Sequence, residues 1–108
     1  MYEYRATITR VVDGDTVHAD VDCGLDIHTR LTIRLYGVNA PEARAPGGKE
    51  AADWLRGKIE GKVVRIETYK DRREKFGRYL ATIYALDETD SVNQQLLDAG
   101  HAVAYFPS

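Results

Sequence analysis

The sequence predicts a mainly β (α+β) domain: a small closed barrel of the OB type with five strands, a helix between the third and fourth strands, and a short C-terminal helix. Short segments rich in β-branched and aromatic residues alternate with turns, and two further segments have helical periodicity. A closed barrel leaves few strand edges exposed, which suits a chain of 108 residues. An SH3-like barrel and a plain α+β sandwich are the competing architectures.

The first three strands are expected at residues 6–12, 16–21 and 27–36. Asp13-Gly14-Asp15 supplies the turn between the first two, because Asp and Gly tolerate tight backbone geometry. In the third strand, Leu31, Ile33 and Leu35 fall on one face. Arg34 is therefore expected to project from the polar face of a rigid strand.

The remaining elements are a Pro- and Gly-rich loop at 39–48, a helix at 49–59, strands at 63–68 and 80–85, and a helix at 92–99. The buried stripe of the first helix is predicted to comprise Ala51, Ala52, Leu55 and Ile59, with Trp54 beside them. Its acidic residues stand near the start and its basic residues near the end, which matches the helix dipole. The whole chain, residues 1–108, is expected to form a single domain.

The composition, with 30% charged and 44% hydrophobic residues, is typical of a soluble globular protein. No apolar run approaches the roughly 20 residues of a membrane span, so no membrane association is expected. The N-terminus has no basic start followed by an apolar stretch, which predicts a cytoplasmic protein unless a leader is missing. Cys23 is the only cysteine, so no internal disulfide can form.

The net charge of −2 argues against a protein that coats nucleic acid through bulk electrostatics. The segment 70–78 nevertheless carries an excess of basic residues. A focused basic site on a neutral-to-acidic body suits an enzyme that must release an anionic product. A solvated surface loop is the alternative explanation of the same charges.

Oxygen atoms that could bind a cation, from side chains and from the backbone, occur in two loops that neighbouring strands bring together. Asp15 lies in the first turn, and Asn39, Ala40 and Glu42 follow the strand that carries Arg34. Taken alone, Asp15 is typical of simple hairpin turns. Calcium accepts carboxylate, amide and backbone oxygens in irregular geometry, so the Asp15 carboxylate, the Asn39 amide oxygen and the Ala40 carbonyl are candidate metal ligands. Glu42 is expected near the ion, where it would hold a coordinated water.

Arg34 and Arg78 are the candidate phosphate-binding residues. A guanidinium matches phosphate oxygens bidentately and stays charged at any working pH. Seen singly, Arg34 could form a surface salt bridge, and Arg78 could set the register after Gly77. Facing one phosphate, the two would stabilise the charge that builds up during in-line displacement.

Four ordered motifs, from about residue 5 to residue 105, give the chain a resemblance to the thermonuclease family of staphylococcal nuclease-like domains. They are Val-Asp-Gly-Asp-Thr-Val (12–17), Ile-Arg-Leu-Tyr-Gly-Val-Asn-Ala-Pro-Glu (33–42), Phe-Gly-Arg-Tyr-Leu-Ala (76–81) and Val-Asn-Gln-Gln-Leu-Leu-Asp-Ala-Gly (92–100). The resemblance implies an OB-fold and calcium-dependent cleavage of DNA and RNA.

The resemblance also implies roles for single residues. It places Asp15, Asn39 and the Ala40 carbonyl at the metal, and Arg34, Glu42 and Arg78 at catalytic positions, with Lys75, Phe76 and Tyr105 at substrate-binding positions. Glu42 would serve as general base or orient the attacking water. Phe76 lacks the hydroxyl that a tyrosine would offer there.

Two features depart from the family pattern. Asn39 stands where well-known members carry a metal-binding aspartate, so the site has one negative charge fewer and calcium is expected to bind weakly. The loop between Glu42 and Glu50 is also shorter than in the well-known secreted nucleases, which is expected to alter how Glu42 is held.

The sequence thus predicts a monomeric calcium-dependent phosphodiester endonuclease acting on DNA, RNA or both. The alternative is a weak or inactive nuclease-like OB module that binds single-stranded nucleic acid or a protein ligand. The combination of Arg34, Glu42 and Arg78 favours the enzyme, because a module that only binds has no need of all three.

Overall fold

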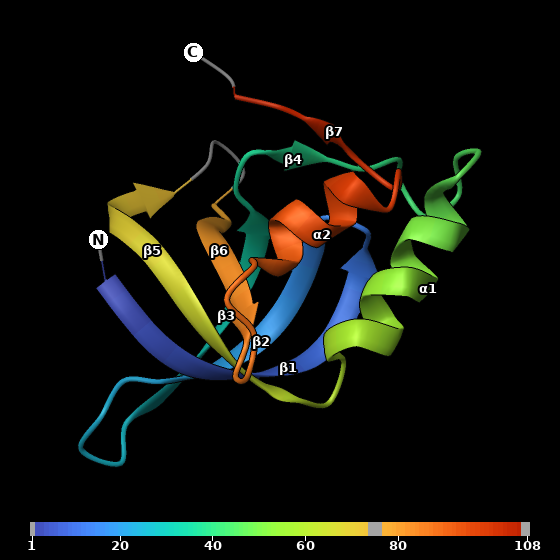
Figure 1. The fold of residues 1–108 in the computed structure, drawn as a ribbon. Coiled ribbons are helices and arrows are strands. Elements are labelled where there is room, and N and C mark those ends of the chain that lie inside the picture. Colours follow the sequence, from blue (N-terminus) through green and yellow to red (C-terminus); the bar gives the residue numbers. More distant parts are fainter. Residues whose placement is uncertain (1, 74–76, 107–108) are drawn as a thin grey trace.

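Five strands close into a barrel in the order β1-β2-β3-β6-β5 (Figure 1). The computed structural model describes residues 2–73 and 77–106. The barrel strands are β1 (Tyr2–Asp13), β2 (Thr16–Asp22), β3 (His28–Leu35), β5 (Val63–Arg73) and β6 (Tyr79–Ala85). The five-stranded barrel predicted from the sequence is confirmed.

The barrel closes through a short parallel pairing between β3 and β6, in which Arg34 lies opposite Leu80. On its other side, Arg34 lies opposite Thr16 of β2 in an antiparallel pairing. The other pairings, β1 with β2, β1 with β5 and β5 with β6, are antiparallel. Arg34 therefore stands in the middle of three hydrogen-bonded strands, which gives its Cα a rigid position.

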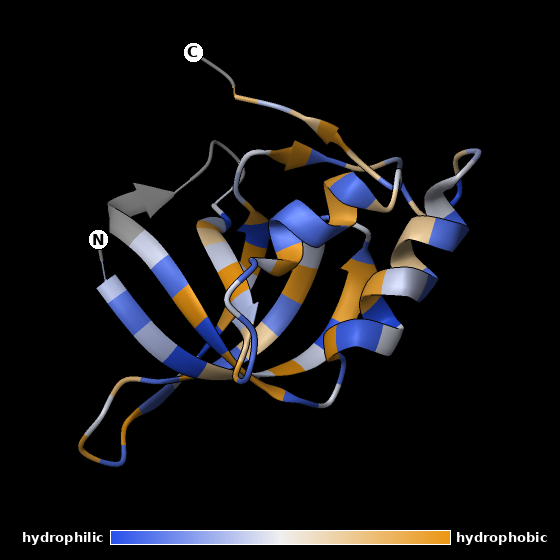
Figure 2. Cartoon of the chain, in the orientation of Figure 1, coloured by the Kyte–Doolittle hydropathy of each residue, from blue (hydrophilic) through white to orange (hydrophobic). Residues whose placement is uncertain are grey.

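The core fills the barrel and continues beneath helix α1 (Gly48–Ile59). Hydrophobic and hydrophilic residues alternate along the strands in Figure 2, as expected where one face of each strand points inward. The predicted stripe of α1 is confirmed, since Ala51, Ala52, Leu55 and Ile59 are all buried. Trp54 is half-buried against this core, and its ring lies 6.0 Å from that of His101.

Helix α2 (Val92–Asp98) begins at Ser91, whose side chain accepts a hydrogen bond from the Gln94 N–H. Buried Asn93 joins this helix to the barrel through three hydrogen bonds. Its Oδ1 accepts from Ile83 N at 3.0 Å, and its Nδ2 donates to Tyr36 O at 2.9 Å and Ala81 O at 3.2 Å. Neither of the described helices has the length and apolar character needed to cross a bilayer.

A second, two-stranded sheet pairs β4 (Val38–Asn39) with β7 (Val103–Ala104), next to α2 (Figure 1). The sequence analysis missed both strands, because two residues are too few to show a period. It also began β1 four residues too late and ended β5 five residues too early. The extra residues of β1 are strand because they pair with β5, for example Tyr2 with Thr68.

Candidate active site

Asp15 anchors the turn between β1 and β2 and is only 6% exposed. Its Oδ1 accepts a hydrogen bond from the Thr16 hydroxyl at 3.0 Å, and its Oδ2 accepts one from the Ala40 N–H at 2.9 Å. Its backbone carbonyl accepts from Leu35 N at 2.8 Å. The sequence of this turn is typical of simple hairpins, yet its Asp15 is hydrogen-bonded both to the end of β3 and to the residue after β4.

Gly14 lets this turn approach the neighbouring elements closely. A Cβ at this position would lie 2.7 Å from the Ala51 Cβ of α1 and 2.9 Å from the Ala40 Cβ. These separations are too short for carbon atoms in contact. The glycine between the two aspartates is therefore needed for packing against α1 and Ala40.

Arg34 is held by four oxygen atoms. Its Nη1 donates to the carbonyls of Leu35 at 3.1 Å and Val38 at 2.7 Å. Its Nη2 donates to Asn39 Oδ1 at 3.1 Å and lies 3.6 Å from Asp15 Oδ2. Only 12% of the side chain is exposed, and these contacts fix the direction of the guanidinium.

Arg78 comes to the same turn from the residue before β6. Its Nη1 donates to the Thr16 hydroxyl at 3.4 Å, and that hydroxyl in turn donates to Asp15. Thr16 is buried and connects the second arginine to the candidate metal ligand. The sequence analysis assigned it no role, although it belongs to the Asp-Gly-Asp-Thr motif.

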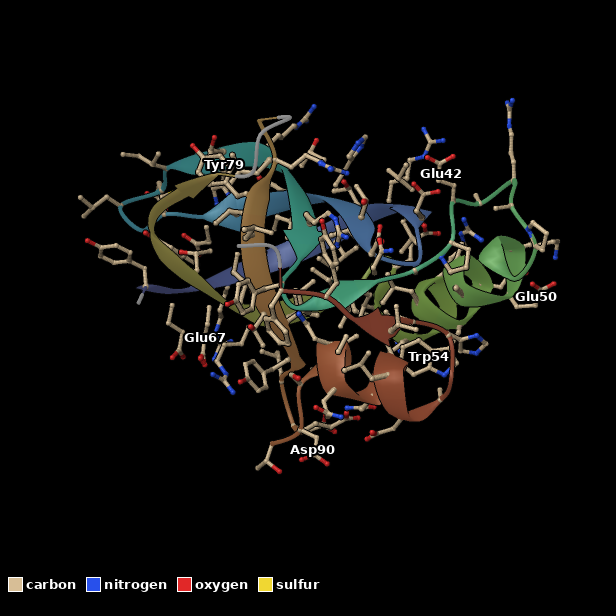
Figure 3. All side chains as sticks on the ribbon, turned by 90° about the horizontal axis from the view of Figure 1, so that it is seen from above. Glu42, Glu50, Trp54, Glu67, Tyr79 and Asp90 are labelled. Atoms are coloured by element: carbon tan, nitrogen blue, oxygen red, sulfur yellow. The ribbon has the colours of Figure 1, made fainter. Side chains whose placement is uncertain are left out.

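Glu42 lies on the loop between β4 and α1, and its side chain is exposed (Figure 3). The hydrogen bonds that join the two arginines to Asp15 do not involve it. Its backbone is held instead: its carbonyl accepts from Ala45 N at 2.8 Å, and Asp13 Oδ1 accepts from the next N–H, that of Ala43, at 2.9 Å. The role of Asp13 is a second feature that the sequence analysis missed.

The predicted substrate-binding residues are described only in part. Lys75 and Phe76 lie outside the described residues. Tyr105 is 48% exposed, and its N–H donates to the Gly37 carbonyl at 2.9 Å, which places it just past β7 and beside the turn before β4. Base stacking on Tyr105 stays a prediction.

The candidate metal ligands suit a hard cation in chemical type but carry little charge. Asp15 Oδ2 and Asn39 Oδ1 both approach one cationic nitrogen, Nη2 of Arg34, so two side-chain oxygens converge on a single point. Within residues 2–73 and 77–106, no three His, Cys, Asp or Glu side chains are grouped so that they could hold a metal ion. One carboxylate, one amide oxygen and the Ala40 carbonyl are oxygen types that calcium accepts, and Arg34 Nη2 occupies the point on which the two side-chain oxygens converge.

Fold and site together define an OB-type barrel with a conformationally fixed arginine, a second arginine and a set of oxygen donors gathered at one turn. The model of the family described as "Staphylococcal nuclease homologue" matches residues 32–108. The chain belongs to this family, which confirms the resemblance inferred from its motifs.

Curated relatives carry nuclease names. The chain is 33% identical over 98 residues to an "Uncharacterized endonuclease" of Escherichia coli O157:H7, covering 91% of this chain and 59% of the relative. It is 32% identical over 105 residues to the "Thermonuclease" of Staphylococcus hyicus, covering 92% and 58%. A "Staphylococcal-like nuclease CAN1" of Arabidopsis thaliana is 35% identical over 79 residues, covering 70% and 23%. The chain thus spans about three fifths of the first two relatives.

Proposed function

We propose that the chain is a phosphodiester endonuclease that acts on DNA, RNA or both and depends on calcium. One observation carries the proposal: Arg34 is held beside Asp15 and Asn39, and Arg78 reaches the same turn through Thr16. Two guanidinium groups close to a set of oxygen donors suit an anionic substrate that needs charge stabilisation. The nuclease names of the relatives agree with this chemistry.

In the proposed mechanism, Arg34 and Arg78 bind the non-bridging oxygens of the scissile phosphate. Arg34 loses little conformational freedom on binding, because the carbonyls of Leu35 and Val38 already hold its guanidinium. Glu42 orients the attacking water or accepts its proton, and its exposed carboxylate is open to both water and substrate.

Asp15, Asn39 and the Ala40 carbonyl would hold the calcium ion. When bound, the ion supplies a positive charge that polarises the phosphate and stabilises the transition state. The hydrogen bond from Ala40 N to Asp15 Oδ2 keeps the two segments that provide these oxygens together. We further propose that residues 1–108 form one domain, because β1 and β2 complete the barrel although they precede the matched residues 32–108.

The test is the cleavage of circular single-stranded DNA and of RNA by the purified chain, with millimolar calcium or with chelator. Calcium-dependent opening of the circle is expected, since only an endonuclease can cut a substrate without ends. Arg78→Ala should abolish cleavage, while Arg10→Ala, at an exposed position of β1, should leave it unchanged and serves as the matched control. DNA circles and RNA that both stay intact at high calcium would refute the proposal.

The alternative is a module that binds nucleic acid or a protein ligand without cutting. Asn39 favours it, because the candidate metal site carries one carboxylate where the family pattern has two. Intact circles that still shift in a binding assay would identify this function. Retention of binding by the Arg78→Ala variant would further indicate that the arginine pair is not the contact surface.

A further inference from the structure

Two hydrogen bonds join the turn between β1 and β2 to the segment after β4. Asp15 Oδ2 accepts the N–H of Ala40, and Asp13 Oδ1 accepts the N–H of Ala43, both at 2.9 Å. The two hydrogen bonds fall on either side of Glu42. The turn therefore supplies a candidate metal ligand and also holds the segment that carries the candidate base.

The start of α1 constrains the same segment from the other side. The carbonyl oxygen of Glu42 accepts from Ala45 N at 2.8 Å, and Gly48 N donates to the Ala45 carbonyl at 2.9 Å. A Cβ on Gly48 would overlap the Glu42 carbonyl oxygen, so the first residue of α1 packs directly against this peptide. The backbone on both sides of Glu42 is thus fixed, although its side chain is exposed.

An exposed carboxylate on a loop has few packing contacts to direct it. Its orientation then depends on where the backbone places its Cα, and a displacement of about 1 Å at a catalytic group can cost about a hundredfold in rate. Asp13 holds the peptide bond that directly follows Glu42. Loss of this hydrogen bond would free the Ala43 N–H and let the Glu42 peptide turn.

We propose that Asp13 is a positioning residue for Glu42: it fixes the direction of the candidate base through the Ala43 N–H and does not contact the reacting atoms. This inference rests on the proposed function, since it assigns Glu42 a catalytic task. The short loop between Glu42 and Glu50 then needs no added length to orient Glu42, because Asp13 and Gly48 hold it from two sides.

Asp13 could instead act through its negative charge near the cation site, and two substitutions separate these effects. Asp13→Asn removes the charge and keeps an oxygen that can accept the Ala43 N–H. Asp13→Ala removes both. Asp87→Ala, at an exposed position after β6, is the matched control for the loss of an aspartate.

Two readouts test the proposal: steady-state cleavage kinetics, and amide hydrogen exchange of Ala43 measured by NMR. Asp13→Ala should lower kcat about ten- to a hundredfold, with KM and the calcium Kd changed less than about twofold. It should also accelerate Ala43 exchange by about tenfold or more. Asp13→Asn should retain most of the kcat and the slow exchange, and thermal unfolding should confirm that both variants are folded.

An equal loss of kcat in Asp13→Asn and Asp13→Ala would overturn the proposal, because it would show that the charge of Asp13 matters and its hydrogen bond to Ala43 does not. Unchanged kcat or unchanged Ala43 exchange in Asp13→Ala would also overturn it. A wild-type chain that cuts no nucleic acid would refute the proposed function. The exchange rates would then still decide whether Asp13 holds the Glu42 segment.

Discussion

Replacing Asn39 by aspartate should strengthen calcium binding by restoring a second carboxylate. The Asn39 Oδ1 already lies at the candidate site, 3.1 Å from the Arg34 nitrogen that also approaches Asp15 Oδ2. Aspartate has nearly the same shape, so the substitution adds charge without moving the oxygen. Because calcium affinity rises with the number of charged ligands, we expect the calcium Kd to fall by roughly one to two decades, about 1.4–2.8 kcal/mol in binding free energy.

The neighbouring arginine limits this gain. An aspartate at this position would form a charge-assisted hydrogen bond with Arg34 in the metal-free protein, and calcium would compete with that interaction. The same hydrogen bond should hold the new carboxylate in place before the ion arrives, which lowers the ordering cost. Because competition with Arg34 opposes this benefit, the expected gain stays at the one to two decades given above and below that of an unpaired carboxylate.

Isothermal titration of calcium into the wild type and the Asn39→Asp variant measures this difference directly. Asp15→Asn is the opposing control, since it removes the remaining carboxylate and should abolish measurable binding. If Asn39→Asp binds calcium no more tightly than the wild type, Asn39 is not a ligand and the reasoning about charge count is wrong. Cleavage at limiting calcium should rise in parallel with affinity.

Three further predictions concern the scaffold. Gly48→Ala should destabilise the fold by about 2 kcal/mol or more in urea unfolding, because its methyl group overlaps the Glu42 carbonyl; an unchanged midpoint would contradict the packing described. Asn93→Ala should cost about 2–4 kcal/mol in the same assay, since it leaves buried backbone groups unpaired, and a loss below about 0.5 kcal/mol would be inconsistent with this role. Hydrogen bonding to Lys58 lowers the pKa of Glu88 from its ordinary value of 4.5, so the stabilising effect of the ionised Glu88 should be present at neutral pH and lost as the pH falls below that value. The melting temperatures of wild type and Glu88→Gln should then converge, and a constant gap would refute this reasoning.

The barrel strands and both helices were predictable because their residues carry local signals. Alternation in β3 placed Leu31, Ile33 and Leu35 inward, and helical spacing identified the buried stripe of α1. The strands β4 and β7 carry no such signal, because two-residue strands exist only through their pairing. The start of β1 was misjudged for the same reason, since Tyr2 is strand because it pairs with Thr68 of β5. The end of β5 was missed because Arg73 is strand through its pairing with Tyr79 of β6.

By itself, the sequence determined the family and the chemical inventory of the site, since both depend on residue types in a fixed order. Only the tertiary structure decided how these groups meet. It fixed Arg34 on two carbonyls, connected Arg78 to Asp15 through Thr16, and brought Asp13 to the Ala43 N–H. The contacts of Arg78 with Thr16 and of Asp13 with Ala43 join residues 62 and 30 positions apart. They leave no local pattern in a single sequence, because they arise only when the barrel closes and α1 packs against its turn.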